Sequence, residues 1–161
     1  MKRNLLCALI AIPAFSFGQT SILSDNFDAY TAGGTVSVES AGFWQTWGAS
    51  LPEDAFVSDS VSSSGANSMN VYQTGFDAYL HDMVLPFPAV YTTGQYELTM
   101  NYFVPANRGA YFNLGSVWAS GGAGYEYGID VFFNADGSGF VTAAGTGVFQ
   151  YGQDEWTAIS V

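Results

Sequence analysis

The stretch YEYGIDVFF, residues 125–133, decides the fold class that the sequence predicts. Large apolar or aromatic side chains occupy every second position from Tyr125 to Phe133, and they are expected on one face of an extended strand. Glu126 and Asp130 fall on the opposite face. Alternation over this length is typical of an antiparallel strand with one buried face and one solvated face.

The same two-residue period recurs in YELTMNYFV, residues 96–104, where Leu98 and Tyr102 share a face. Glycine-containing turn sequences separate the predicted strands, and they read TAGG, SSGAN, TTGQ, PANRG and NADGSG. Asp136 and Gly137, in the last of these, form a strong hairpin signal. We therefore expect an all-β protein whose antiparallel strands form a sandwich or a jelly roll.

The N-terminus has the three parts of a signal peptide. Lys2 and Arg3 provide a cationic start, LLCALIAIPAFSF is apolar, and the small residues of SFGQ suit cleavage before Gln19. The apolar run is shorter than the roughly 18 residues that a membrane span needs, and no later run reaches that length. We expect residues 1–18 to be a signal peptide and residues 19–161 to form one secreted or cell-surface domain without membrane insertion.

Acidic residues dominate the charge of the chain. The sequence has 14 Asp and Glu against three Lys and Arg, which gives a formal net charge of −11. Arg108 is the only strong cation outside the predicted signal peptide. Nucleic acids and anionic membrane surfaces require clustered cations, so the sequence argues against both as partners. Calcium binding, neutral glycan binding or solubility alone are all compatible with this charge.

The reactive side chains limit the chemistry that the chain could perform. His81 is the only histidine and Cys7 is lost with the signal peptide, so a two-histidine zinc site and thiol catalysis are excluded. Carboxylate chemistry remains. Glu126 and Asp130 share a strand face, but their spacing separates them by roughly 13 Å, too far for a glycosidase pair. No catalytic residue is therefore assigned.

Two tryptophans lie three positions apart in FWQTWGAS, residues 43–50. In an extended segment Trp44 and Trp47 point to opposite faces, so one of them can be core while the other lies near the surface. Core packing of both tryptophans is the favoured interpretation, because aromatic residues dominate sandwich cores. The alternative is that the exposed ring stacks on a sugar ring. The candidate glycan-binding residues are Trp44, Trp47 and Trp118.

Three carboxylates are candidate calcium ligands. Glu53 and Asp54 share the loop after the tryptophans, and Asp28 reaches them if the N-terminal segment returns beside that loop. Carboxylate oxygens are the ligands that calcium prefers, while a solvated acidic loop is the alternative. NADGSG lacks the repeated acids and the terminal glutamate of an EF-hand loop, so we interpret it as a hairpin.

Six sequence segments, in a fixed order, cover nearly the whole chain after residue 18. They are DNFDAYTAGG, FWQTWGASLPEDAFVSDS, GANSMNVY, YTTGQYELTMNYFVPANRGAYFNLG, YEYGIDVFFNADGSG and FQYGQDEW. Together they resemble the concanavalin A-like (laminin-G-like) jelly-roll module of exported bacterial proteins that often end in a type IX secretion sorting tail. The resemblance implies a sandwich of lectin or glucanase shape within a larger surface protein, and it carries over no catalytic residues. Such modules continue beyond a phrase like DEWTAISV. The resemblance therefore implies a module that is incomplete at its C-terminal end, or one whose last strands a partner supplies.

The function expected from the sequence is that of an exported, non-catalytic module that binds a polysaccharide or another glycan. A structural or adhesive module that mediates protein contacts at the cell surface is the alternative from another class. A carbohydrate-active hydrolase with atypical carboxylates is the third. Exposed aromatic side chains in a row would favour the first function, and two nearby carboxylates in a cleft would favour the third.

Overall fold

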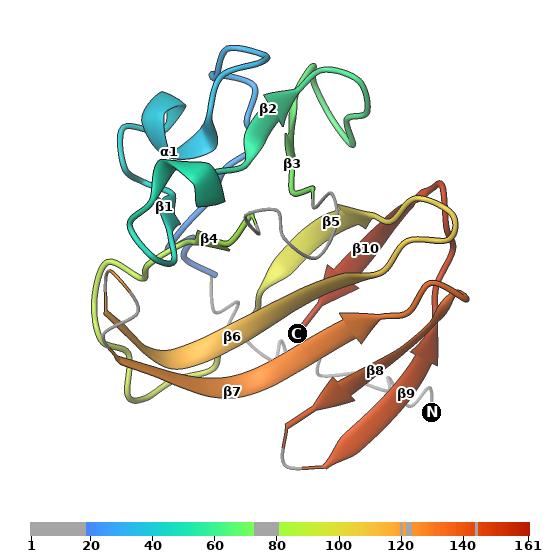
Figure 1. The fold of residues 1–161 in the computed structure, drawn as a ribbon. Coiled ribbons are helices and arrows are strands. Elements are labelled where there is room, and N and C mark those ends of the chain that lie inside the picture. Colours follow the sequence, from blue (N-terminus) through green and yellow to red (C-terminus); the bar gives the residue numbers. More distant parts are fainter. Residues whose placement is uncertain (1–18, 73–80, 120, 122–123, 144) are drawn as a thin grey trace, which may run out of the picture.

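The computed structural model describes residues 19–72, 81–119, 121, 124–143 and 145–161. Strands account for 39% of the chain and helices for 6%, and the strands pair in antiparallel sheets. The all-β class and the antiparallel sheets that the sequence predicts are therefore confirmed. Figure 1 shows short elements at one end of the molecule and a long, twisted sheet at the other.

The short elements come from the first half of the chain. They are α1 (Val36–Glu39), β1 (Gln45–Thr46), the 3-10 turn η1 (Leu51–Glu53), β2 (Phe56–Ser58), β3 (Ser68–Asn70) and β4 (Met83–Val84). β1 pairs with β4, and β2 pairs with β3. Polar turn sequences separate these strands, which keeps each of them short.

The second half of the chain forms the larger sheets. Its strands are β5 (Thr99–Phe103), β6 (Ala110–Ala119), β7 (Gly124–Phe133), β8 (Ser138–Thr142), β9 (Thr146–Gln150) and β10 (Trp156–Ser160). The strands β6, β7, β8 and β9 make a four-stranded meander, and β10 pairs with β5. The long strand predicted from residues 125–133 is β7, so that prediction is correct in position.

The hairpin between β7 and β8 forms at the predicted turn. Gly137 has a positive φ of 82°, a conformation that costs other residues energy. One Asp136 carboxylate oxygen accepts a hydrogen bond of 2.9 Å from the Ser138 backbone N–H and another from the Ser138 hydroxyl. These bonds lower the pKa of Asp136.

The predicted facing of β7 is wrong in its first half. The register shifts near Gly128, so that Ile129 pairs with Leu114 but Tyr127 pairs with Gly115. Such a β-bulge adds one residue to a strand and reverses the alternation beyond it. Tyr125 and Tyr127 therefore leave the core face, where the simple period had placed them, and lie on the outer face.

The second-half strands enclose a core of their own. Val104, Val131 and Phe133 are buried, and the half-buried side chains packed around them are Tyr102, Ala110, Phe112, Ile129, Val141, Phe149, Tyr151 and Ile159. Because these residues come from both sheets, the β5–β10 pair packs against the inner face of the β6–β9 sheet. This face is the one we call inner below, and its opposite is the outer face.

A smaller core holds the short elements together. Val36, Ala55 and Val57 are buried, and the half-buried side chains around them are Phe27, Tyr30, Trp44, Met69 and Met83. Val36 N–H donates to the Ala55 carbonyl at 2.9 Å, which ties α1 to the segment before β2. This core positions β1 and β4, which in turn place Trp47.

The predicted signal peptide, residues 1–18, lies outside the described residues. Within the described ranges, none of the helices has the length and apolar character needed to cross a membrane.

Candidate functional site

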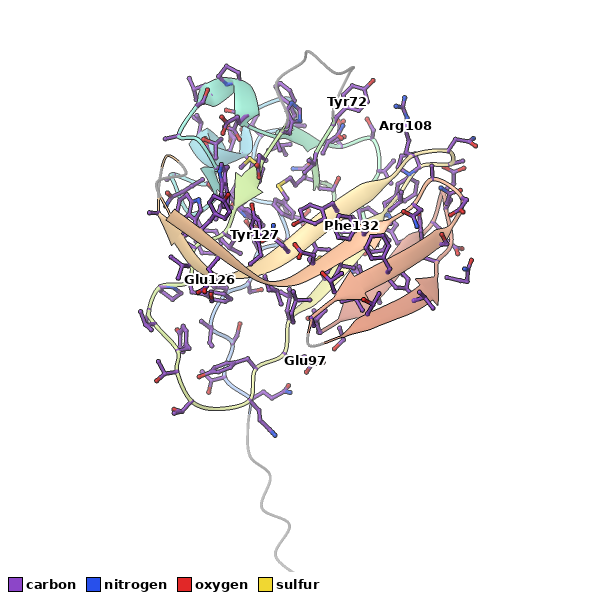
Figure 2. All side chains as sticks on the ribbon, turned by 60° about the horizontal axis from the view of Figure 1, so that its bottom comes forward. Tyr72, Glu97, Arg108, Glu126, Tyr127 and Phe132 are labelled. Carbon is purple, nitrogen blue, oxygen red and sulfur yellow. The ribbon has the colours of Figure 1, made fainter. Side chains whose placement is uncertain are left out.

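An aromatic cluster forms where β1 meets the outer face of β7. The ring centroids of Trp47 lie 5.5 Å from Tyr125 and 6.1 Å from Tyr127, and the two tyrosine rings are 5.1 Å apart. Tyr125 is 58% exposed and Tyr127 is 47% exposed, while Trp47 is half-buried beneath them. Figure 2 shows Tyr127 on the same strand as Phe132, further from the β7–β8 turn.

Trp118 belongs to the same surface. It is the direct cross-strand partner of Tyr125, and paired residues in an antiparallel ladder point to one face. Its indole N–H is buried and has no hydrogen-bond partner among the described residues. We call Trp47, Trp118, Tyr125 and Tyr127 the aromatic surface.

Backbone contacts fix Trp47 in this place. Its N–H donates to the Asp82 carbonyl at 2.9 Å, directly beyond the pairing of Thr46 with Met83. The Asp82 N–H in turn donates to the Glu53 carbonyl at 2.9 Å. The loop of η1, the strand β4 and the segment after β1 are thus joined beside the aromatic surface.

Two carboxylates flank these joined segments. The pKa of Asp82 is raised mainly by desolvation and, to a smaller extent, by the negative charge of Glu53. Glu53 itself accepts a hydrogen bond of 2.5 Å from the Gly48 backbone N–H. Asp82 also contributes to a raised pKa of Tyr127, whose largest cause is desolvation. Asp82 therefore lies close to both Glu53 and the aromatic surface.

A polar cluster continues the outer face toward the other end of β7. The Tyr111 hydroxyl donates to one Asp130 carboxylate oxygen at 2.5 Å, and the Asn113 amide donates to the Tyr111 oxygen at 3.1 Å. Thr142 donates its hydroxyl to the second Asp130 oxygen at 3.2 Å. Desolvation and the bond to Asp130 raise the pKa of Tyr111 to about 12. This cluster offers both donors and acceptors next to Tyr127.

The surroundings of the site are acidic. Desolvation is the largest cause of the raised pKa of Tyr127, and the charges of Asp82 and Asp130 add to it, so two carboxylates lie near this side chain. Arg108 precedes β6, at the end of the strand opposite to Trp118 (Figure 2). The site therefore suits a ligand that offers hydroxyl donors and no negative charge.

Trp44 does not join the aromatic surface. It is half-buried in the small core, with its ring centroid 5.8 Å from that of Phe27, and its indole N–H donates to Asp25 at 2.8 Å. Of the three tryptophans named from the sequence, Trp47 contacts Tyr125 and Tyr127, Trp118 pairs with Tyr125 across the β6–β7 ladder, and Trp44 packs in the small core. The core packing that the sequence favours for both tryptophans is found for Trp44, whereas Trp47 is half-buried against Tyr125 and Tyr127.

The three candidate calcium ligands do not form one group. Both oxygens of the buried Asp54 accept hydrogen bonds from Ser37, whose N–H lies at 3.1 and 3.3 Å and whose hydroxyl bonds to one of them. One carboxylate oxygen of Asp28 accepts hydrogen bonds from the backbone N–H groups of Ala66 and Asn67, at 2.8 and 3.1 Å. Within the described part of the chain, no three His, Cys, Asp or Glu side chains are arranged to hold a metal ion.

A shallow pocket of about 240 Å³ lies beside β1, and none of the four residues of the aromatic surface lines it. Its lining residues are Ser37, Gly42, Trp44, Gln45, Thr46, Ala49 and Leu51. It has no ionisable side chain in its lining, so it offers less chemistry than the aromatic surface.

Sequence reasoning missed four residues of this region: Asp82, Tyr125, Tyr127 and Asp130. The missed signal was Gly128, because a glycine inside a strand pattern often marks a bulge. A bulge there would have moved both tyrosines to the outer face. The closeness of Asp82 depends on the pairing of β1 with β4, which the sequence does not reveal.

Comparison of the chain with family models, with curated proteins and with solved structures gave no match in any of the three.

Proposed function

We propose that the protein is a non-catalytic module that binds a neutral polysaccharide or another neutral glycan through its aromatic surface. The observation that carries this proposal is the clustering of two exposed tyrosines over Trp47, beside the carboxylate of Asp82. Soluble proteins rarely leave several aromatic rings together at the surface without a ligand or partner.

The chemistry of the site fits a sugar. Aromatic rings contribute a flat apolar area that matches the C–H face of a pyranose, and they lose little conformational freedom when a ligand binds. The carboxylates of Asp82 and Asp130 accept hydrogen bonds from ring hydroxyls, while Asn113 can donate. The same carboxylates repel anionic glycans, which restricts the proposal to neutral ones.

Pull-down on insoluble polysaccharides, followed by calorimetry with soluble oligosaccharides, tests the proposal. Tyr125→Ala and Trp47→Ala should each weaken binding by at least about fivefold, since a central aromatic contact contributes more than about 1 kcal/mol. Tyr125→Phe should retain most of the affinity because it keeps the ring.

Tyr72→Ala is the matched control, because Tyr72 is 50% exposed and is absent from the aromatic surface. Its affinity should equal that of the wild type. An equal loss in Tyr72→Ala and Tyr125→Ala would contradict the proposed site, and wild-type protein that binds none of a broad set of neutral glycans would contradict the function.

Hydrolysis of the bound glycan is a second candidate function, favoured by one observation. Desolvation and the charge of Glu53 raise the pKa of Asp82. In a glycosidase, the general acid likewise has a raised pKa and works beside a second, ionised carboxylate. Release of reducing ends by the wild type but not by Asp82→Asn would support hydrolysis. Binding without any release supports the module without catalysis.

The finer architecture and the setting of the module are also proposals. We infer that the two packed sheets belong to a jelly-roll sandwich, that the protein is exported and works at the cell surface, and that it is part of a larger surface protein. Calcium binding by Asp28, Glu53 and Asp54 stays a prediction. A rise in melting temperature on adding calcium, reversed by a chelator, would support it.

A further inference from the structure

The outer face of the four-stranded sheet carries an apolar ladder that crosses all four strands. Tyr111 pairs with Phe132, Phe132 pairs with Phe140, and Phe140 pairs with Val148. The ring centroids are 4.7 Å apart in the first pair and 4.5 Å apart in the second, where the rings are stacked at 16°. The ladder ends at Val148 on the edge strand β9, where that side chain is 85% exposed.

This ladder is distinct from the aromatic surface in what it presents. Phe132 and Phe140 turn their ring faces toward each other, so their edges point outward. Stacked rings of this kind offer no flat face for a sugar, and they suit contact with other apolar side chains. The ladder is therefore unexplained by glycan binding.

Strand β9 is an unprotected edge. Within the described residues it pairs only with β8, and Figure 1 shows it as the outermost strand of its sheet. Natural edge strands are usually protected by lysine, proline, inward charges or a bulge, and TGVFQ, residues 146–150, contains none of these. No charged residue lies between Asp136 and Asp154.

The opposite edge of the same sheet is protected. The Tyr102 hydroxyl donates to the Tyr111 carbonyl at 3.1 Å, and the register of β6 is irregular between Leu114 and Val117. The exposed positions on the outer side of the β5–β10 pair are mostly polar, and they include Thr99, Asn101 and Ser160. Among these sheet edges, β9 alone combines free backbone groups with an exposed apolar ladder.

The hydrogen-bond pattern shows which groups of β9 face outward. Tyr151 N–H donates to the Gly137 carbonyl at 3.0 Å, and bonded positions recur at every second residue of an antiparallel ladder. Gly147 and Phe149 therefore direct their backbone groups to β8. Thr146, Val148 and Gln150 direct theirs away from the sheet.

From this pattern we infer that two copies of the chain associate through antiparallel pairing of β9 with β9, with the two-fold axis at Val148. In this register Val148 meets Val148 of the second copy as a hydrogen-bonded pair, which extends the apolar ladder into the partner. Gly147 lies opposite Phe149 of the second copy, so the larger side chain meets the smallest. Thr146 lies opposite Gln150, and their outward backbone groups pair as well.

Charge limits where a second copy can bind. Two chains that each carry −11 repel one another over most of their surface, and they can approach closely only where carboxylates are absent. The uncharged segment that contains β8 and β9 is such a place. An acidic or basic peptide would find no charged side chain on β9 to recognise.

Sedimentation velocity over a range of protein concentrations tests the dimer. The wild type should shift from monomer to dimer as concentration rises, and Val148→Lys should weaken the association by at least about tenfold because two like charges would meet at the axis. Val90→Lys is the matched control, since Val90 is 90% exposed in a loop. It should dimerise as the wild type does.

Both substitutions lie at exposed positions, and circular dichroism checks that each variant is folded. A wild type that stays monomeric throughout would overturn the inference. So would a Val148→Lys variant that dimerises as strongly as the wild type.

Disulfide formation tests the register separately. In a Cys7→Ser background, Val148→Cys should oxidise rapidly to a covalent dimer, because a hydrogen-bonded antiparallel pair places Cα atoms about 5.5 Å apart. Val90→Cys should cross-link slowly and only at high concentration. Equal rates for the two cysteine variants would show that Val148 does not lie at the axis.

Discussion

Asp54 illustrates how one buried carboxylate can be mistaken for a ligand. The side chain is 2% exposed, and its oxygens accept the backbone N–H and the hydroxyl of Ser37 at the start of α1. A buried charge is tolerated only when such partners satisfy it. The position of Asp54 in the sequence, beside Glu53 and Pro52, gives no indication of this burial.

Replacing Asp54 by alanine should therefore destabilise the protein. The change leaves the Ser37 N–H and hydroxyl without their charged acceptor in a buried place, and we expect the free energy of unfolding to fall by about 2–3 kcal/mol. Asp59→Ala, at an exposed position, should change it by less than about 0.5 kcal/mol. Urea denaturation of both variants measures the difference, and equal stabilities would show that the Ser37 contacts contribute little.

At the scale of elements, the β7–β8 hairpin and the β7 bulge both depend on glycine, yet only one was foreseen. Asp136 and Gly137 stand between two alternating runs, which is a local signal for a turn. Gly128 stands inside one alternating run, and its bulge requires the shifted pairing with β6. A turn signal is local, whereas a bulge is defined by two strands together.

The turn provides a prediction about stability. Gly137→Ala should lower the free energy of unfolding by about 1 kcal/mol, because alanine is strained at a φ of 82°. Gly124→Ala is the control, since a Cβ there meets no atom and the residue has no positive φ. Thermal unfolding followed by circular dichroism compares the two, and the hairpin argument fails if Gly137→Ala is as stable as Gly124→Ala.

At the scale of the whole molecule, tyrosines carry much of the packing, and several hold their protons strongly. Burial raises the pKa of Tyr102 to about 12, and desolvation together with Asp130 raises that of Tyr111 to about 12. Desolvation and the bond to Asp25 raise the pKa of Tyr30 further. Tyr30 packs against the small core and Tyr102 against the larger one, and Tyr111 bonds to Asp130 on the outer face. The raised pKa values link the ionisation of these groups to unfolding.

Alkaline titration should show that linkage. A raised folded-state pKa means that the contribution of these tyrosines to stability is complete below pH 10, the ordinary value, and is lost as pH rises toward 12. Phenolate absorbance should therefore rise in two stages, with the second coinciding with loss of the circular dichroism signal. In concentrated guanidinium all tyrosines should titrate together near 10. A single stage near pH 10 in the folded protein would contradict the assignment.

The sequence by itself determined the all-β class, the positions of β5 and β7 and the hairpin at Asp136. Each of these follows from a two-residue period or from local turn chemistry, which neighbouring residues set. Only the tertiary structure decided that Tyr125 and Tyr127 gather over Trp47. Their facing depends on a bulge between two strands, and the position of Trp47 depends on the pairing of β1 with β4. Contacts between segments far apart in the chain are made by packing and register, and no local pattern specifies them.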